Sequence, residues 1–146
     1  MYKLPPTIYT KSQLRQLQTE LNQLSSLRTA KNIVLSANLQ DLATHNGLKD
    51  LNTALVKKLL TFVESTLQKA PEISLSLASL PNVEERSELV SWLRGKFNAQ
   101  LMLHIIIQPE LLAGCMLRTD SNVYDWSLRT ALESNQEKLV ARLAHV

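Results

Sequence analysis

The residues with the greatest capacity for covalent or metal chemistry are one cysteine, Cys115, and three histidines, His45, His104 and His145. None of the histidines is spaced from another histidine, the cysteine or a carboxylate as metal ligands are, so the sequence predicts no metal site. A Cys115–His104 dyad would need a hairpin to bring the side chains together and a third residue to orient the imidazole. The sequence indicates neither that residue nor a surrounding pocket. We therefore expect Cys115 to be a small buried side chain and His104 a core or edge histidine.

Glycine and cysteine usage limits the chemistry further. The three glycines, Gly47, Gly95 and Gly114, are too widely separated for a phosphate-binding loop or a dinucleotide fingerprint. A single cysteine excludes an internal disulfide, which is compatible with a reducing compartment. These observations favour a protein that is not an enzyme, that binds no cofactor and that has no small-molecule substrate.

Charge and apolar patterning narrow the classes of partner. Sixteen basic and thirteen acidic residues give a net charge of +3, and the basic residues are spread along the chain. A nucleic-acid-binding protein usually gathers its basic residues into a stripe, so we expect no nucleic-acid partner. No apolar run approaches the ~18–20 residues that cross a bilayer, and the start of the chain has no apolar stretch typical of a signal peptide. We expect a cytosolic protein that reaches a membrane through other proteins.

The first part of the chain shows helical periodicity. It begins near Thr10 or Ser12, either of which can cap a helix. A stripe of leucines at three- and four-residue spacing follows and predicts either packing on neighbouring helices or a coiled-coil-like seam for a partner helix. The stripe comprises Leu14, Leu17, Leu21 and Leu24.

Two more helices are predicted before Pro71. The second ends at residues 45–47, where Gly47 suits a left-handed C-terminal cap. Its apolar set is Ile33, Val34, Leu35, Leu39 and Leu42. The third begins at Leu48 and ends before Pro71. Its apolar set is Leu51, Leu55, Leu59, Phe62 and Val63.

The pattern changes after Pro71. Residues 73–77 alternate apolar side chains with serines, which predicts a strand with one buried face. A helix then begins after Pro81, with Glu84 and Glu85 in its first turn, where the helix dipole favours acids. We expect Trp92 in the core beside the inner face of this helix. That inner face is predicted to be Leu89, Val90, Leu93 and Phe97.

The rest of the chain predicts two strands and a last helix. Residues 100–107 are almost continuously apolar, which is typical of a central strand covered on both sides. Residues 114–119 predict another strand and residues 119–122 a turn. Asp125 or Ser127 then caps a helix, beside which Trp126 is equally compatible with local packing and with a partner contact. The side chains that this helix is expected to bury are Leu128, Leu132, Leu139 and Leu143.

These elements predict an α+β fold in two parts. Residues 1–70 form an N-terminal helical segment of about three helices, and residues 71–146 form a small α/β unit. The order in the second part is strand, helix, strand, strand, helix.

The order and spacing of these pieces after Pro71 resemble a known family. The chain reads EISLSLA, NVEERSELVSWLRGKF, AQLMLHIII, QPELLAGCMLRT, DSN and DWSLRTAL. The sequence is similar here to the delta subunit of F-type ATP synthase, which is called oligomycin-sensitivity-conferring protein in mitochondria. The resemblance covers Pro71 to about Leu143, roughly half the chain.

The matching segment supplies candidate structural and interface residues. Gly114 allows an unusual backbone torsion at the entry to a strand, and Asp125 can accept hydrogen bonds from the first free amides of the last helix. Ser127 and Arg129 are placed to tie the hairpin to the helix. The full set is Leu112, Gly114, Asp125, Trp126, Ser127, Leu128, Arg129 and Leu132.

The chain departs from the family pattern in three ways. Ala113 occupies a position where the family usually has a second glycine, and Trp126 one where it has a small residue. The family also has a larger N-terminal helical bundle than the three helices expected here. That bundle holds the N-terminal tails of the catalytic alpha subunits.

The resemblance implies a non-catalytic stator subunit of a proton-driven rotary F-type ATP synthase, in its F1 sector and peripheral stalk. Its implied partners are the alpha and b subunits, and its implied location is the cytoplasmic face of a bacterial cell membrane. A mitochondrial or chloroplast location is less favoured because no transit peptide is seen. The main alternative is a peripheral-stalk subunit of an A/V-type ATPase or another helical adaptor. A small enzyme built on Cys115 and His104 is the least favoured interpretation.

Overall fold

A computed structural model describes residues 2–26 and 34–143 of the chain. It combines helices with a four-stranded sheet, so the α+β class predicted from the sequence is confirmed. The chain divides into two compact units, Met1–Glu72 with Val83–Leu103, and Ile73–Asn82 with His104–Val146. We call them the helical unit and the strand unit. The predicted division into domains at residue 71 stays a prediction.

The first helix of the helical unit, α1 (Lys11–Ser26), begins at a reciprocal cap. The backbone N–H of Gln13 donates to Thr10 Oγ1 over 3.2 Å, and the side-chain Oε1 of Gln13 accepts from the backbone N–H of Thr10 over 3.0 Å. Each side chain thus satisfies an amide that the helix itself leaves free. Thr10 is therefore the cap that the sequence offered as one of two choices.

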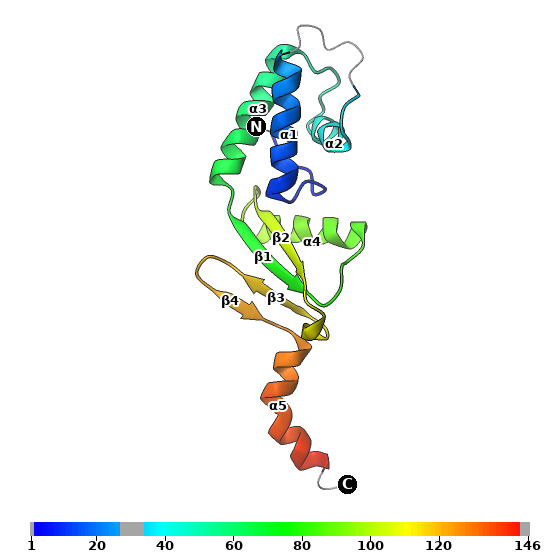
Figure 1. The fold of residues 1–146 in the computed structure, drawn as a ribbon, viewed down its shortest axis with the longest axis vertical. Coiled ribbons are helices and arrows are strands. Elements are labelled where there is room, and N and C mark those ends of the chain that lie inside the picture. Colours follow the sequence, from blue (N-terminus) through cyan, green and yellow to red (C-terminus); the bar gives the residue numbers. More distant parts are fainter. Residues whose placement is uncertain (1, 27–33, 144–146) are drawn as a thin grey trace. The chain divides into compact units, whose positions relative to one another are not determined.

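The leucine stripe of α1 is buried inside the helical unit. Leu14, Leu17 and Leu21 are completely inaccessible to solvent and Leu24 nearly so. They share one core cluster with residues of α3 (Thr53–Lys69), and Figure 1 shows α1 and α3 side by side. Packing within the chain is confirmed for this stripe, and the predicted seam for a partner helix is wrong.

Two more helices complete the first part of the helical unit. Helix α2 (Ala37–His45) is capped by Ser36, which was not predicted. Gly47 follows the helix at φ 68°, the left-handed torsion predicted there. Helix α3 (Thr53–Lys69) starts five residues later than predicted, because Asn52 accepts a hydrogen bond from the amide of Leu55 and fixes the start there. Of the apolar set assigned to the second helix, Val34 is exposed outside any helix, and Ile33 lies outside the described residues.

Helix α4 (Val83–Lys96) belongs to the helical unit and has the predicted acids, Glu84 and Glu85, in its first turn. Its buried residues are Val90 and Leu93, two of the four that the sequence assigned to its inner face. Phe97 follows the helix and is exposed, and Trp92 is 58% exposed. The predicted burial of Phe97 and Trp92 is therefore wrong.

The residues before α1 have little regular structure but are held closely. Arg94 of α4 donates to the carbonyl oxygens of Leu4, Pro5 and Ile8. Asn46 pairs with both the N–H and the C=O of Lys3. These side chains form hydrogen bonds with backbone N–H and C=O groups that a helix or strand would otherwise pair.

The sheet has the order β2-β1-β3-β4. The strands are β1 (Glu72–Leu77), β2 (Met102–Ile107), β3 (Cys115–Arg118) and β4 (Val123–Asp125). Strand β1 follows the predicted alternation at Ile73 and Leu75, which are buried, but Ser76 is buried as well and Leu77 is only half-buried. Strand β2 lies at the edge of the sheet, and its residues His104 and Ile107 are exposed. The prediction of a central strand covered on both sides is therefore wrong.

The other half of the sheet is a hairpin. Strand β3 (Cys115–Arg118) pairs antiparallel with β1 and with β4 (Val123–Asp125). The turn between β3 and β4 is closed by the amide of Thr119 donating to the carbonyl of Asn122 over 2.8 Å. Strand β4 and the 3-10 helix η1 (Pro109–Leu111) were not predicted, so the order of elements differs in detail from the expected one.

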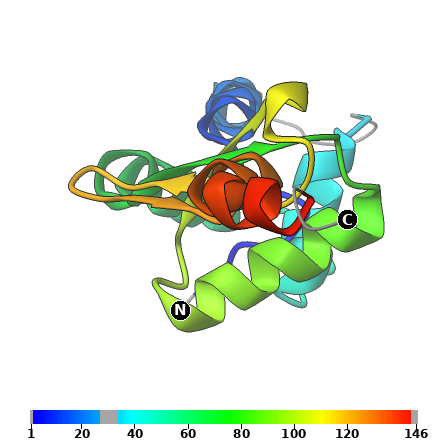
Figure 2. The ribbon, with the colours of Figure 1, turned by 90° about the horizontal axis from the view of Figure 1, so that it is seen from below.

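The last helix, α5 (Leu128–Leu143), starts where the hairpin ends. Figure 2 shows α5 nearly end-on, with the β3–β4 hairpin extending sideways from its base. Its side chains from Leu128 to Gln136 are all exposed. Leu128 is 45% and Leu132 is 42% exposed, so their predicted burial is wrong. The side chains of Leu139 and Leu143 lie outside those that the structure describes.

Candidate functional site at the base of the last helix

The residues singled out in the sequence meet in one place, where η1, the start of β3, the end of β4 and the first turns of α5 come together. We call this place the α5 junction, and its residues are 109–115 and 125–133. Leu111 of η1 is buried here. The junction lies wholly within the strand unit.

The chain enters β3 through two unusual backbone torsions. Leu112 has φ 66° and ψ −53°, and the amide of Ala113 donates to the carbonyl of Leu111 over 2.8 Å. This geometry is a γ-turn of the rare form, which is strained for a residue with a side chain. Gly114 follows at φ 81°. The sequence identified Gly114 for this reason and offered no sign of the torsion at Leu112.

Gly114 is required for a second, steric reason. A Cβ atom added at this position would lie 2.1 Å from the backbone oxygen of Trp126. Only glycine lets the two segments approach so closely. Backbone hydrogen bonds on either side of Gly114 hold the two segments together. The amide of Leu128 donates to the carbonyl of Ala113, and the amide of Trp126 donates to the carbonyl of Cys115.

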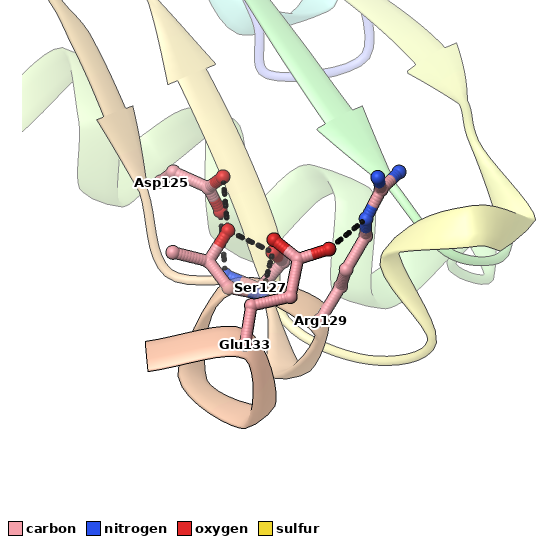
Figure 3. A network of polar contacts seen from close by, with 5 residues as sticks. Asp125, Ser127, Arg129 and Glu133 are labelled. Atoms are coloured by element: carbon pink, nitrogen blue, oxygen red, sulfur yellow. Dashed lines mark hydrogen bonds and ion pairs between the residues drawn. The ribbon is translucent and has the colours of Figure 1, made fainter. Parts of the chain in front are cut away.

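A small polar network caps α5 (Figure 3). Asp125 accepts from the backbone N–H of Ser127 through Oδ1 over 2.9 Å, and from the Thr130 hydroxyl through Oδ2 over 2.7 Å. Ser127 Oγ accepts from the amide of Thr130 over 3.3 Å. Ser127 is therefore the helix cap and Asp125 supports it. Thr130 was missed from the sequence, although a hydroxyl three residues after a capping serine could have indicated it.

The network favours the ionised form of the Asp125 carboxyl. Hydrogen bonds from Thr130 and Ser127 lower the pKa of the Asp125 carboxyl, with a smaller contribution from the positive charge of Arg129. The group therefore stays ionised at neutral pH and continues to accept its hydrogen bonds.

Arg129 acts within the helix. Its Nε donates to Oε1 of Glu133 over 2.9 Å, one turn further along α5 (Figure 3). This bond raises the pKa of Arg129. Both side chains are exposed, so water screens their attraction and the pair contributes little to helix stability. The hydrogen bond of Arg129 thus lies within α5, and its predicted link to the hairpin is limited to the charge interaction with Asp125.

Apolar side chains surround this polar centre and face solvent. Leu112 is 60% exposed and Trp126 is 61% exposed. Trp126 stacks on Tyr124 of β4, with ring centres 5.6 Å apart and planes 10° from parallel. Leu128 and Leu132 are four residues apart and therefore lie on the same face of α5. The junction thus combines a well-fixed backbone with an exposed apolar surface.

The residues with potential for covalent chemistry are not brought together. Strand β1 separates β2, which carries His104, from β3, which carries Cys115, so the backbones of the two residues are at least two strand spacings apart, about 9–10 Å. Burial, and to a lesser degree the charge of Asp125, raises the pKa of the Cys115 thiol. A raised pKa disfavours the nucleophilic thiolate. Among the described residues, no group of three or more His, Cys, Asp or Glu side chains is placed to hold a metal ion.

The strand unit thus presents a capped helix whose side chains from Leu128 to Gln136 are exposed. The family model described as ATP synthase delta (OSCP) subunit matches residues 68–139. The matched segment contains every candidate residue of the junction, and the resemblance predicted for the C-terminal half of the chain is confirmed. No curated protein matches the chain.

Crossing a bilayer requires an apolar helix of about 20 residues. Within residues 2–26 and 34–143, no helix has both the length and the apolar character that this requires.

Proposed function

We propose that this protein is a non-catalytic stator subunit in the peripheral stalk of a proton-driven rotary F-type ATP synthase. It would link the catalytic F1 head to the b-subunit stalk. The family match to residues 68–139 is the observation that carries this proposal. The placement at the cytoplasmic face of a membrane, held there by its partners, belongs to the same proposal.

The surroundings of α5 support a role in binding another protein. An isolated helix of this length is marginal in water, because most helix stability in proteins comes from packing an apolar face. From Leu128 to Gln136, α5 packs no side chain into a core. A partner helix that covered Leu128 and Leu132 would bury the 45% and 42% of these side chains that are exposed. The gain for each leucine is a little under half of the about 1.5–3 kcal/mol that accompanies burial of a fully exposed leucine.

The proposed partner at this surface is the C-terminal part of the b subunit. An amphipathic helix binds a surface of this kind through apolar residues at three- and four-residue spacing. The α5 junction would transmit load because its backbone is fixed by Gly114 and by the Asp125–Ser127–Thr130 network. The residues of 1–70 would face the head and contact the alpha subunit.

The direct test is binding between the full chain and a peptide from the C-terminal region of the b subunit. Leu132→Asp should abolish that binding while leaving the melting temperature unchanged, because Leu132 is exposed. Ser134→Asp is a matched control, since it places the same charge on the opposite face of α5, where Ser134 is also exposed. Equal binding by the wild type and the Leu132→Asp variant would overturn the proposed surface.

The complex itself provides the second test. Purified from native membranes, the protein should co-elute with alpha, beta and b subunits, and a chaotrope without detergent should release it. Migration as a free monomer, with no ATPase subunit in the same fraction, would contradict the proposed function.

A further inference from the structure

A cavity in the helical unit has no role in the proposed function. Its volume is about 520 Å³, within the range of small-ligand sites of about 300–1,000 Å³. It is formed between the residues that precede α1, the end of α2 and the end of α4. The lining that matters here is Lys3, Leu4, His45, Arg94 and Gly95.

Arg94 places a partly buried guanidinium in the lining of this cavity. Four of the five N–H donors of its guanidinium bind carbonyl oxygens, those of Leu4, Pro5, Ile8 and Leu101. Within the described residues, no carboxylate forms an ion pair with it. Burial lowers the pKa of Arg94 to about 10, which is the effect of a cation removed from water without a compensating anion.

The rest of the lining carries no negative charge. Lys3 contributes a second cation, and none of the lining residues is acidic. Buried charges in proteins are normally paired. The cavity therefore offers a partly buried cation, an N–H donor not used by the described residues and an excess of basic groups beside apolar surface.

Gly95 gives an independent reason to regard the cavity as a site. It lies in the last turn of α4, where glycine is less stable than alanine by up to about 1 kcal/mol. A Cβ atom at Gly95 would meet no atom within 4 Å, and its φ is not in the left-handed region. Neither backbone conformation nor crowding requires glycine there, and its effect is to leave the cavity unfilled.

We propose that this cavity binds a small carboxylate carried on an apolar chain, with the carboxylate at Arg94 and Lys3. A carboxylate supplies the anion that Arg94 lacks, and charge-assisted hydrogen bonds of this kind are among the stronger ones in proteins. The apolar chain would lie against Leu4 and the neighbouring apolar surface.

The test is a titration of the full chain with octanoate, followed by the amide signals of Gly95 and of Lys3 in NMR spectra. We expect saturable shifts confined to the cavity residues. Octan-1-ol, which has the apolar chain without the charge, should bind at least ten times more weakly, and so should inorganic phosphate, which has the charge without the chain. Equal binding of octanol or phosphate would overturn the proposal.

Two variants separate the site from the fold. Gly95→Leu should fill the cavity and reduce octanoate affinity at least tenfold, while Ser91→Leu, which adds the same side chain to α4 outside the cavity, should leave the affinity unchanged. Neither position requires the structure to shift, because both are exposed. Unaltered affinity in Gly95→Leu, or shifts concentrated at the exposed leucines of α5, would also overturn the proposal. A failure here leaves the test with the b-subunit peptide unaffected.

Discussion

Helices α1 and α5 both carry leucines at helical spacing, and their surroundings are opposite. Leu14, Leu17 and Leu21 of α1 are fully buried, whereas Leu128 and Leu132 of α5 are 45% and 42% exposed. The difference follows from what each helix packs against. Helix α1 has α3 beside it, while the described side chains of α5 have no core to enter. An apolar face therefore indicates that something must cover it and does not indicate whether the cover belongs to the same chain.

The first prediction, which has the largest expected effect, compares the same substitution in α1 and in α5. Leu17→Asp should unfold the helical unit, because burying an unpaired charge costs several kcal/mol, comparable with the whole stability of about 5–15 kcal/mol of a small protein. Leu132→Asp should change the free energy of unfolding by no more than about 0.5 kcal/mol. Urea denaturation followed by circular dichroism measures both. Unfolding caused by Leu132→Asp would mean that α5 is packed within the chain after all.

The second prediction compares two glycines with positive φ. Gly114→Ala should destabilise the protein by more than about 2 kcal/mol, because a left-handed torsion costs about 1–2 kcal/mol and the new Cβ would collide with the Trp126 carbonyl. Gly47→Ala has the same torsional cost and open space around its Cβ. Its effect should be about 1–2 kcal/mol. Urea denaturation measures the free energy of unfolding of both variants. Equal losses of stability would show that the backbone of the α5 junction moves enough to accommodate the new Cβ atom.

The third prediction concerns the cap of α5. Ser127→Ala should cost about 1 kcal/mol, because it removes the acceptor for the amide of Thr130. Ser134→Ala is the matched control, since Ser134 is exposed within α5 and its hydroxyl donates to the carbonyl of Ala131 in the same helix. It should be neutral or slightly stabilising. The free energies of unfolding of the two variants, compared with the wild type, check the role of the cap.

The fourth prediction is a pH dependence. The pKa of Asp125 is lowered in the folded state, so its stabilising contribution is fully present above the unfolded-state pKa of about 3.9. That contribution is lost as the pH falls through the lower pKa of the folded state. Melting temperatures of the wild type and Asp125→Asn should therefore differ at neutral pH and converge in acid.

Thr130→Val tests the cause of that pH dependence. The Thr130 hydroxyl contributes most to lowering the pKa of Asp125. Its removal should raise that pKa toward the ordinary value and reduce the pH-dependent part of the stability. A Thr130→Val variant with the wild-type pH profile would contradict the assignment.

The smallest effect is expected at Leu112. Leu112→Gly should raise the stability by up to about 1 kcal/mol, because glycine adopts the torsion without the strain that leucine carries there. Leu112→Ala removes the same exposed surface and keeps most of the strain, so it should not stabilise. If Leu112 contacts the b subunit, both variants should bind the b-subunit peptide more weakly than the wild type does. Stabilisation by alanine as large as that by glycine would show that the torsion is not strained.

Local patterns were enough to predict much of the fold. Thr10, Gly47 and the acids of α4 define helix ends through contacts between residues close in sequence. The alternation in β1 likewise predicted the burial of Ile73 and Leu75, although Ser76 is buried too. Predictions failed where the outcome depends on neighbours distant in sequence. Strand β2 is as apolar as a central strand, yet it lies at the edge of the sheet.

The candidate site was predictable to a similar degree. Gly114, Asp125 and Ser127 were identified from residue type and position, because a positive φ and a helix cap have strong local signatures. The torsion at Leu112 and the stacking of Trp126 on Tyr124 were not, since leucine rarely adopts that torsion and aromatic contacts have no fixed spacing. Exposure of Leu128 and Leu132 was missed because their spacing is that of a buried face.

The irregular residues before α1 behave as part of the folded helical unit. Arg94 and Asn46 use the backbone oxygens of Lys3, Leu4, Pro5 and Ile8 as acceptors, and the side chain of Ile8 is fully buried. An expression fragment trimmed to begin at α1 would leave a guanidinium without most of its acceptors and a vacancy where Ile8 had been. The shortest version of this unit that can be studied alone therefore has to start ahead of Lys3.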